Sequence, residues 1–175
     1  GATKTLIKIP LVNSVIYNKV CGSMIEFFGG ELVEVVIGGA ALNPDVEKFL
    51  RKIRFPYTVG YGMTECGPLI SYAYWTKYKE RSSGKVVDRM EVRIDSEDPQ
   101  NIVGEILTRG SNVMLGYYKN EEATKEAFTV DGWLKTGDLG YLDNKGYLHI
   151  TGRIAEMIIR GGENISPAEI EECIK

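Results

Sequence analysis

The segment 61–65, with the sequence YGMTE, combines side chains that could together bind a nucleotide. An aromatic ring such as that of Tyr61 can stack on a purine, a contact that contributes about 1–3 kcal/mol. The Thr64 hydroxyl can donate to a phosphate oxygen, and the Glu65 carboxylate is a hard ligand for Mg²⁺. The same segment also fits a strand end that turns through Gly60 and Gly62 and places Tyr61 in a core. Taken alone, it leaves both interpretations open.

Other glycine-containing segments could supply the remaining contacts to such a ligand. The segment 38–42 (GGAAL) follows a predicted strand, and glycine backbone lets a flat ring approach closely. Asp138 stands in a turn at 135–139 and can accept hydrogen bonds from both hydroxyls of a ribose, while Arg153 can bind hydroxyls or a phosphate. Each also has a plain interpretation, as a turn into a helix, an ordinary turn or a surface charge. Their joint order along the chain favours the functional interpretation.

The composition is typical of a globular protein that recognises a small molecule locally. Of the 175 residues, 43% are hydrophobic and 26% are charged, and the net charge is -3, so nothing suggests a nucleic-acid-binding surface. No apolar run approaches the roughly 20 residues that span a bilayer, and the N-terminus lacks the layout of a secretory signal. We therefore expect a cytoplasmic protein that binds no nucleic acid.

The cysteines and the single histidine exclude several kinds of site. Cys21, Cys66 and Cys173 are widely spaced and form no CxxC pair, which argues against a disulfide framework or a zinc site. Because His149 is the only histidine, a metal site built on several imidazoles is excluded. It stands between two apolar residues in an alternating pattern, so we expect it on the surface of a strand and set hydrolase chemistry aside.

The first 80 residues have the pattern of a β-α-β unit. Apolar periodicity predicts a helix over 11–28, a short buried strand over 32–37 and another strand over 57–61. Asn43 and Pro44 supply an N-cap and a first helical position between the two strands. The helix that they begin is expected to bury one apolar face, made of Val46, Phe49, Leu50 and Ile53.

Beyond residue 80 the pattern becomes mainly antiparallel β. Alternating side chains predict a strand over 90–94, a turn, and a hairpin partner over 103–108. A short helix begins at Asn120, and a second hairpin pairs residues 139–142 with 147–151.

The last 24 residues predict a further short strand and the beginning of a helix. The strand is expected over 157–159, followed by a turn at Gly161 and Gly162. Ser166, Pro167 and Glu169 form a capping box with proline at the first helical position. Since the chain stops inside this helix, we expect it to be a fragment.

Taken together, these segments strongly resemble the adenylate-forming superfamily, in its acyl-CoA synthetase branch, and most closely the long-chain fatty acid–CoA ligases. The resemblance covers residues 33–175. It rests on the order and spacing of GGAAL, GYGMTE, GEILTRGSNVMLGYY, DGWLKTGDLGYL, ITGR and RGGENISPAEIEE.

The resemblance implies a fold and three parts. We expect a mixed α/β (α+β) fold in which residues 1–80 form the C-terminal part of a large-domain α/β layer. Residues 81–152 would form an antiparallel β-barrel-like subdomain, and residues 153–175 would begin a small α+β C-terminal domain.

The resemblance also implies a reaction and its small-molecule partners. A fatty acid carboxylate attacks the α-phosphate of ATP, giving an acyl-adenylate and pyrophosphate, and the thiol of coenzyme A then displaces AMP. ATP, Mg²⁺ and coenzyme A are therefore expected, while peripheral membrane contact and the oligomeric state are left open.

By motif, Thr64 would contact the phosphate and Glu65 would bind the Mg²⁺, and these two are the expected catalytic residues. Asp138 would bind the ribose, and Arg153 would contact the nucleotide. The adenine side of the site would comprise Gly39, Ala40, Ala41, Tyr61 and Gly62.

The chain departs from the family pattern in three ways. We find no glycine-rich phosphate loop with its lysine, and the family's C-terminal lysine would lie beyond Lys175. Ala155 stands where the family usually has an acidic residue or lysine at the hinge before the C-terminal domain. We therefore expect the isolated chain to bind ATP weakly and to be nearly inactive.

Two other functions stay open from the sequence. One is an adenylate former for an aryl or amino acid, with most of its acid pocket upstream and with Ser71 and Gly84 as candidate lining residues. The other is a non-catalytic nucleotide-binding module.

Overall fold

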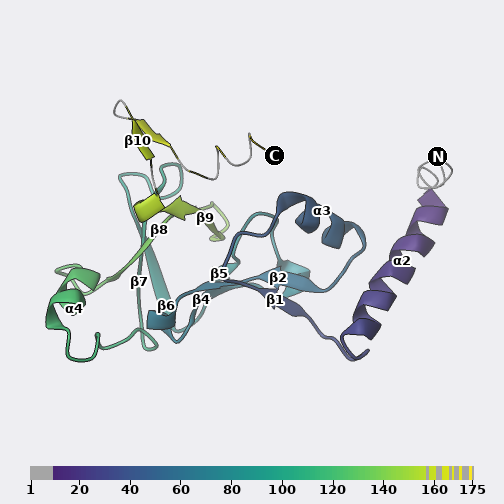
Figure 1. The fold of residues 1–175 in the computed structure, drawn as a ribbon, viewed down its shortest axis with the longest axis horizontal. Helices are drawn as coiled ribbons and strands as arrows, with labels where there is room; N and C mark the ends of the chain where they lie inside the picture. The colour runs from purple at the N-terminus through teal and green to yellow at the C-terminus, as the bar shows by residue number, and fades with distance from the viewer. Residues whose placement is uncertain are drawn as a thin grey trace.

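A computed structural model describes residues 10–156, 158–160, 163–165, 167, 170 and 174 (Figure 1). Helix α2 lies at one end of the molecule, and the four-stranded sheet and α4 lie toward the other. The helices are α2 (Pro10–Phe27), α3 (Pro44–Lys52) and α4 (Glu121–Ala127). The strands are β1 (Val35–Ile37), β2 (Tyr57–Val59), β3 (Tyr61–Gly62), β4 (Leu69–Tyr72), β5 (Lys85–Val86), β6 (Met90–Asp95), β7 (Gly104–Gly110), β8 (Leu134–Leu142), β9 (Leu148–Arg153), β10 (Ile158–Arg160) and β11 (Glu163–Ile165).

The predicted β-α-β unit is confirmed. Strands β1 and β2 pair in parallel, with Val35 opposite Tyr57, and α3 connects them. The Asn43 side chain caps α3 by accepting from the backbone N–H of Asp45 at 2.9 Å. A buried cluster that includes the end of α3 packs against α2. It comprises Leu50, Ile53, Phe55 and Tyr57.

Of the four residues predicted to form the buried apolar face of the helix α3, only Leu50 and Ile53 are buried. Val46 and Phe49 are exposed, whereas Glu47 is buried at 3% exposure. The Glu47 carboxylate accepts from the Tyr78 hydroxyl and, at 3.0 Å, from the backbone N–H of Arg81. These bonds satisfy the charge and allow the helix to face the core through Glu47 and Leu50 rather than through Val46 and Phe49.

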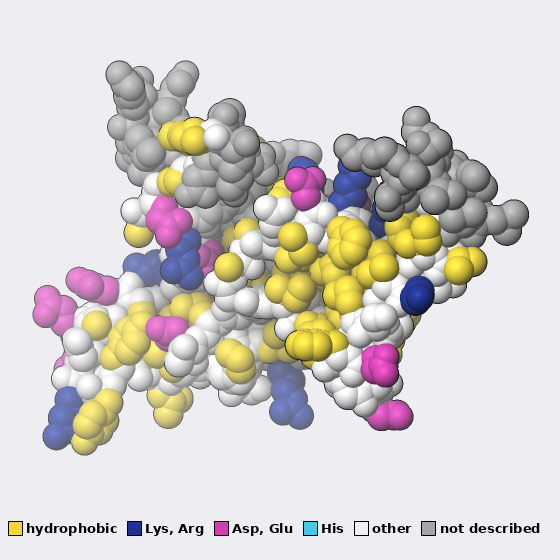
Figure 2. Space-filling model, turned by 45° about the vertical axis from the view of Figure 1, so that its right-hand side comes forward, with side chains coloured by type: hydrophobic (Ala, Val, Ile, Leu, Met, Phe, Trp, Pro, Cys, Tyr) yellow, Lys and Arg dark blue, Asp and Glu magenta, His cyan; other side chains and the backbone are white. Residues whose placement is uncertain are grey.

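The surface at the end of the molecule that carries α2 is rich in apolar side chains. Figure 2, turned to bring the right-hand side of Figure 1 forward, shows hydrophobic side chains gathered there. Large exposed hydrophobic residues between positions 10 and 60 include Phe27, Phe28, Val33, Val36, Val46 and Phe49. The described residues therefore leave much apolar surface uncovered in this region.

The chain beyond residue 80 is mainly antiparallel β, as predicted, but the antiparallel pairing already begins at β3. Strands β6, β7, β8 and β9 form a four-stranded sheet in sequence order, and β3, β4 and β5 form a three-stranded one. Backbone hydrogen bonds of 2.8 Å link Leu148 in β9 to Ser83 and Gly84, which lead into β5. The two sheets are thus joined around one core in the barrel-like manner expected. This core comprises Tyr61, Cys66, Ile70, Met90, Ile94, Ile106, Leu134 and Leu148.

The prediction that His149 lies on a strand surface is wrong. The side chain is buried, with 8% exposure, and stacks on Tyr141 with the ring centroids 4.7 Å apart. Its Nδ1 lies 2.8 Å from the Arg81 carbonyl oxygen, and its Nε2 lies 3.1 Å from Oδ2 of Asp143. The alternating pattern correctly placed Leu148 in the core, but it gave no sign that residues near Arg81 cover the other face of β9.

Asp143 is the centre of this partly buried polar cluster. Burial alone would raise the pKa of Asp143, but hydrogen bonds from Lys79, from the Tyr147 backbone N–H, from His149 and from the Lys145 backbone N–H together lower it below its usual range. The folded state therefore favours the charged carboxylate.

The end of the described chain contains one further hairpin. Strands β10 and β11 pair antiparallel, with Ile159 opposite Asn164. The strand predicted over 157–159 is therefore present one residue later. The turn at Gly161 and Gly162 and the capping box at Ser166 and Glu169 lie outside the residues whose structure and side chains are described. Within the described residues, no helix combines the length and hydropathy needed to cross a membrane.

We predict that Asp143→Asn lowers the free energy of unfolding at pH 7 by about 1–3 kcal/mol, because it weakens a partly buried, charge-assisted network. Since the folded-state pKa is lowered, the contribution of Asp143 is complete above its unfolded pKa and is lost as pH falls. The difference between wild type and variant should therefore shrink from about pH 5 downward in urea denaturation.

Asp88→Asn is the matched control, because it removes the same charge from an exposed position. A difference between wild type and Asp143→Asn that stayed constant across this acidic range would contradict the charge-based explanation.

Candidate functional site

Two of the sequence motifs meet at a small cavity of about 230 Å³. One wall comes from the turn that follows β1, and the other comes from β3 and the residues flanking it. The lining residues are Val36, Gly38, Gly39, Gly60, Tyr61, Gly62, Pro68 and Leu69. The GGAAL and GYGMTE segments, about 20 residues apart in the sequence, therefore lie side by side. Ala40 and Ala41 are exposed and follow directly after this wall without lining it.

Two of the glycines that line this cavity, Gly62 and Gly39, are required by its geometry. A Cβ on Gly62 would lie 2.0 Å from the backbone oxygen of Pro68, which is far inside van der Waals contact. Gly39 has φ +83°, a conformation that side chains other than glycine rarely adopt. The walls at these points are bare backbone, which a flat ring could approach closely.

Tyr61 combines both of the interpretations that the sequence left open. Its ring is 8% exposed and belongs to the main core, yet it also lines the cavity. Its hydroxyl donates to Oδ2 of Asp138 at 2.7 Å. Burial raises the pKa of Tyr61, a bond with Thr136 opposes this, and the bond to Asp138 adds to it. The hydroxyl therefore stays protonated as a donor at neutral pH.

Asp138 joins Tyr61 to Arg153. Arg153 stands opposite Asp138 in the pairing of β8 with β9, and its Nε lies 2.9 Å from Oδ1 of the carboxylate. The side chain of Asp138 is 8% exposed, whereas that of Arg153 is 65% exposed. The three residues thus form a continuous polar chain that runs from the cavity wall to the surface.

The predicted turn at 135–139 is instead part of strand β8, with Gly137 at φ +72° directly before Asp138. This part of β8 is supported by two residues that we did not predict as part of the site. Thr136 donates to the Ile106 carbonyl at 2.7 Å and accepts from the Asp138 backbone N–H at 3.1 Å. Glu105 accepts from the backbone N–H of Gly137 at 3.0 Å. Both lie inside motifs quoted above, but their role depends on the pairing of β7 with β8, which the sequence does not specify.

Thr64 and Glu65 occupy a short 3-10 turn, Thr64–Cys66, directly after β3. Thr64 is exposed and Glu65 is half-buried. Oε1 of Glu65 accepts from the Tyr117 hydroxyl at 2.9 Å, and this bond raises the pKa of Tyr117. Sequence reasoning missed Tyr117, although it lies in the GYY end of a motif quoted above.

Ser71 and Gly84, the candidate acid-pocket residues, do not line this cavity. Ser71 is fully buried and donates to the Ser83 carbonyl at 2.8 Å. A Cβ on Gly84 would lie 2.2 Å from the backbone carbon of Tyr72. Both positions are therefore filled by the packing of β4 against β5 and the residues leading into it.

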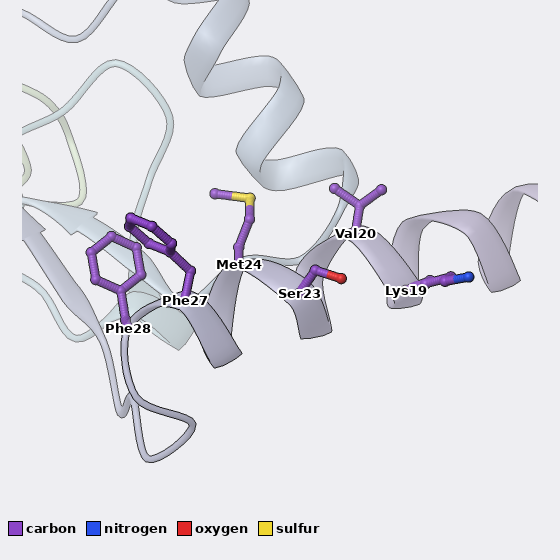
Figure 3. Close-up of a pocket in the computed structure, with 6 residues that line it drawn as sticks. All are labelled: Lys19, Val20, Ser23, Met24, Phe27 and Phe28. Carbon is purple, nitrogen blue, oxygen red and sulfur yellow. The ribbon is translucent and has the colours of Figure 1, made fainter.

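A larger hollow of about 590 Å³ lies elsewhere, along α2 (Figure 3). Its lining is mainly apolar and comprises Lys19, Val20, Ser23, Met24, Phe27 and Phe28. None of these is a predicted site residue, and none carries a carboxylate. The smaller cavity beside Tyr61 is therefore the better candidate site, because it holds the glycine backbone and adjoins the polar side chains.

The model of the family described as AMP-binding enzyme matches residues 12–118, which is more than half of the chain. The match includes the cavity walls, Thr64, Glu65 and Tyr117. The chain belongs to this family. The fold expected for the adenylate-forming superfamily is thereby confirmed.

Similar proteins include ligases for different acids. The chain is 44% identical over 142 residues to a 2-succinylbenzoate–CoA ligase of Bacillus cytotoxicus, covering 78% of this chain and 29% of that protein. It is 42% identical over 141 residues to a long-chain-fatty-acid–CoA ligase of Bos taurus, covering 79% and 19%. The chain thus spans less than a third of these relatives. The predicted resemblance to long-chain fatty acid ligases is not specific, because a 2-succinylbenzoate–CoA ligase is at least as similar.

Solved structures share the fold. The o-succinylbenzoate coenzyme A synthetase of Bacillus subtilis in complex with AMP has a TM-score of 0.75 and 35% identity, covering 89% of this chain and 34% of that one. The same enzyme in complex with ATP and magnesium ion has a TM-score of 0.73 and 35% identity, covering 87% and 34%.

We predict that Gly62→Ala lowers the free energy of unfolding by about 2 kcal/mol or more, because the new methyl group would overlap Pro68 backbone. Thermal denaturation measures the change. Gly22→Ala is the control, since Gly22 lies inside α2 with nothing within 4 Å of its Cβ position. That variant should be neutral or more stable by about 0.5–1 kcal/mol. Equal melting temperatures for wild type and Gly62→Ala would refute the close approach.

Proposed function

We propose that the complete protein is an ATP-dependent acid–CoA ligase that forms an acyl-adenylate and transfers the acyl group to coenzyme A. One observation carries the proposal: a glycine-walled cavity adjoins the polar chain of Tyr61, Asp138 and Arg153. The family membership, and relatives that are named as CoA ligases, support it.

In this proposal the cavity holds the adenine. Gly39 presents backbone to one edge of the base, with Ala40 and Ala41 following directly beside this wall, and Tyr61 and Gly62 form the opposite wall. Asp138 accepts the ribose hydroxyls. Its carboxylate can accept about four hydrogen bonds, so the bonds from Tyr61 and Arg153 leave it capacity for a diol. Arg153, being mostly exposed, can turn its guanidinium toward the nucleotide.

Thr64 and Glu65 stand on the phosphate side of the proposed site. The exposed Thr64 hydroxyl can donate to a phosphate oxygen as charge develops during attack on phosphorus. Glu65 suits Mg²⁺, which proteins bind through one or two carboxylates together with substrate phosphates. Among the described residues, no three acidic, histidine or cysteine side chains gather as a metal site of their own. The single Glu65 carboxylate fits an ion that arrives with ATP and neutralises phosphate charge.

The identity of the acid substrate is the more specific part of the proposal. The sequence motifs favour a fatty acid, and the 42% identity to a long-chain-fatty-acid–CoA ligase supports it. The 44% identity to a 2-succinylbenzoate–CoA ligase favours an aryl acid as a second candidate. We further propose that the protein acts in the cytoplasm.

A panel of acids, assayed with the complete protein, ATP and Mg²⁺, tests the function. We expect acid-dependent pyrophosphate release, and acyl-CoA formation when coenzyme A is added, with long-chain fatty acids giving the highest kcat/KM. Faster turnover of 2-succinylbenzoate would replace the fatty acid assignment. ATP binding without pyrophosphate release for any acid would indicate a non-catalytic nucleotide-binding module instead.

We predict that Tyr61→Phe weakens ATP binding about tenfold, because loss of the hydroxyl leaves the buried Asp138 carboxylate without one of its two orienting bonds. Isothermal titration calorimetry measures the change. Tyr57→Phe is the control: its buried hydroxyl also donates a hydrogen bond, but to the Glu47 carbonyl in the other core cluster. An equal loss of ATP affinity in both variants would show that the effect is one of general stability.

A further inference from the structure

The residues that follow β7 fold back over the turn that carries Glu65. The backbone N–H of Met114 donates to the Glu65 carbonyl at 2.7 Å. The Asn112 side chain donates to the carbonyl of Cys66 and, at 3.2 Å, to that of Leu69. Two of these hydrogen bonds therefore hold the turn and the third holds the start of β4, and none of them involves the Glu65 side chain.

A fourth bond reaches the Glu65 side chain itself. The hydroxyl of Tyr117, 52 residues away in the sequence, lies 2.9 Å from Oε1 of the carboxylate. A half-buried glutamate on a short turn would otherwise sample several rotamers. The Tyr117 hydroxyl, bound to Oε1, restricts these rotamers and leaves Oε2 without this partner and free to face a ligand.

Tyr117 is itself anchored from the opposite side. Its backbone N–H donates to Oγ1 of Thr124 at 2.9 Å, and Thr124 donates to the Asn120 carbonyl at 2.7 Å. A Cβ on Gly116 would lie 2.7 Å from the Thr124 side chain, so the chain passes tightly over the beginning of α4. Tyr117 is thus held between α4 and Glu65.

We propose that Tyr117 is a positioning residue that orients Glu65 as a ligand for the Mg²⁺ of a Mg²⁺–ATP complex; this inference rests on the proposed function. Donors that hold a ligating carboxylate commonly influence metal affinity tenfold or more. The role requires the hydroxyl and not merely the ring, because the other bonds to the turn persist without it.

The test compares how strongly Mg²⁺ promotes ATP binding in three versions of the complete protein. ATP dissociation constants are measured by calorimetry without acid substrate, once with saturating Mg²⁺ and once with a chelator. Their ratio is the coupling between metal and nucleotide. We expect Tyr117→Phe to lower this ratio about tenfold and to leave the metal-free dissociation constant unchanged.

Tyr118→Phe is the matched control, because it removes the same oxygen from a neighbouring ring that is 88% exposed. It should leave both dissociation constants unchanged. An unaltered ratio in Tyr117→Phe would overturn the proposal. So would an equal weakening with and without Mg²⁺, which indicates a merely structural role, or an equal effect of the two substitutions.

The outcome in the wild type separates this inference from the proposed function. Wild-type protein that binds ATP with no dependence on Mg²⁺ would overturn the role of Tyr117 while retaining the nucleotide site. Wild-type protein that binds no ATP under either condition would overturn the proposed function, and the inference with it.

Discussion

The candidate site depends on one buried carboxylate, that of Asp138. Removing such a charge from water is unfavourable by several kcal/mol unless partners replace the lost hydration. Here Tyr61 and Arg153 each bond one oxygen. Because Tyr61 lies in β3 and Arg153 in β9, this carboxylate links the three-stranded sheet to the four-stranded sheet. The same contacts therefore stabilise the fold and fix the polar edge of the cavity.

The local support of Asp138 follows from the sheet that carries it. Strand β8 pairs with β7 on one side and with β9 on the other, so the backbone near Asp138 is held on both edges. Thr136 then accepts from the backbone N–H of Asp138, and Glu105 accepts from that of Gly137. A side chain placed in this way loses little freedom when a ligand binds, which favours affinity.

Sequence reasoning worked where the signal is local and failed where a partner is distant in the sequence. Apolar periodicity and the Asn43 and Asn120 caps correctly gave the helices, and alternation gave the hairpins. Glu47 was missed because its partners, Tyr78 and Arg81, are more than 30 residues away. Tyr61, Asp138 and Arg153 could be named from motif order, but the bond from Tyr61 to Asp138 spans 77 residues and requires the three-dimensional structure.

The two interpretations of the YGMTE segment turn out to be complementary. Tyr61 and Cys66 are both buried in the same core, while Thr64 between them is exposed and Glu65 is half-buried. The polar residues therefore lie on a short segment whose two ends, Tyr61 and Cys66, are fixed by burial in the core. Fixing both ends of the segment limits the positions available to the Thr64 hydroxyl and the Glu65 carboxylate. Core packing of Tyr61 is thus the physical condition for the chemistry of its neighbours, rather than an alternative to it.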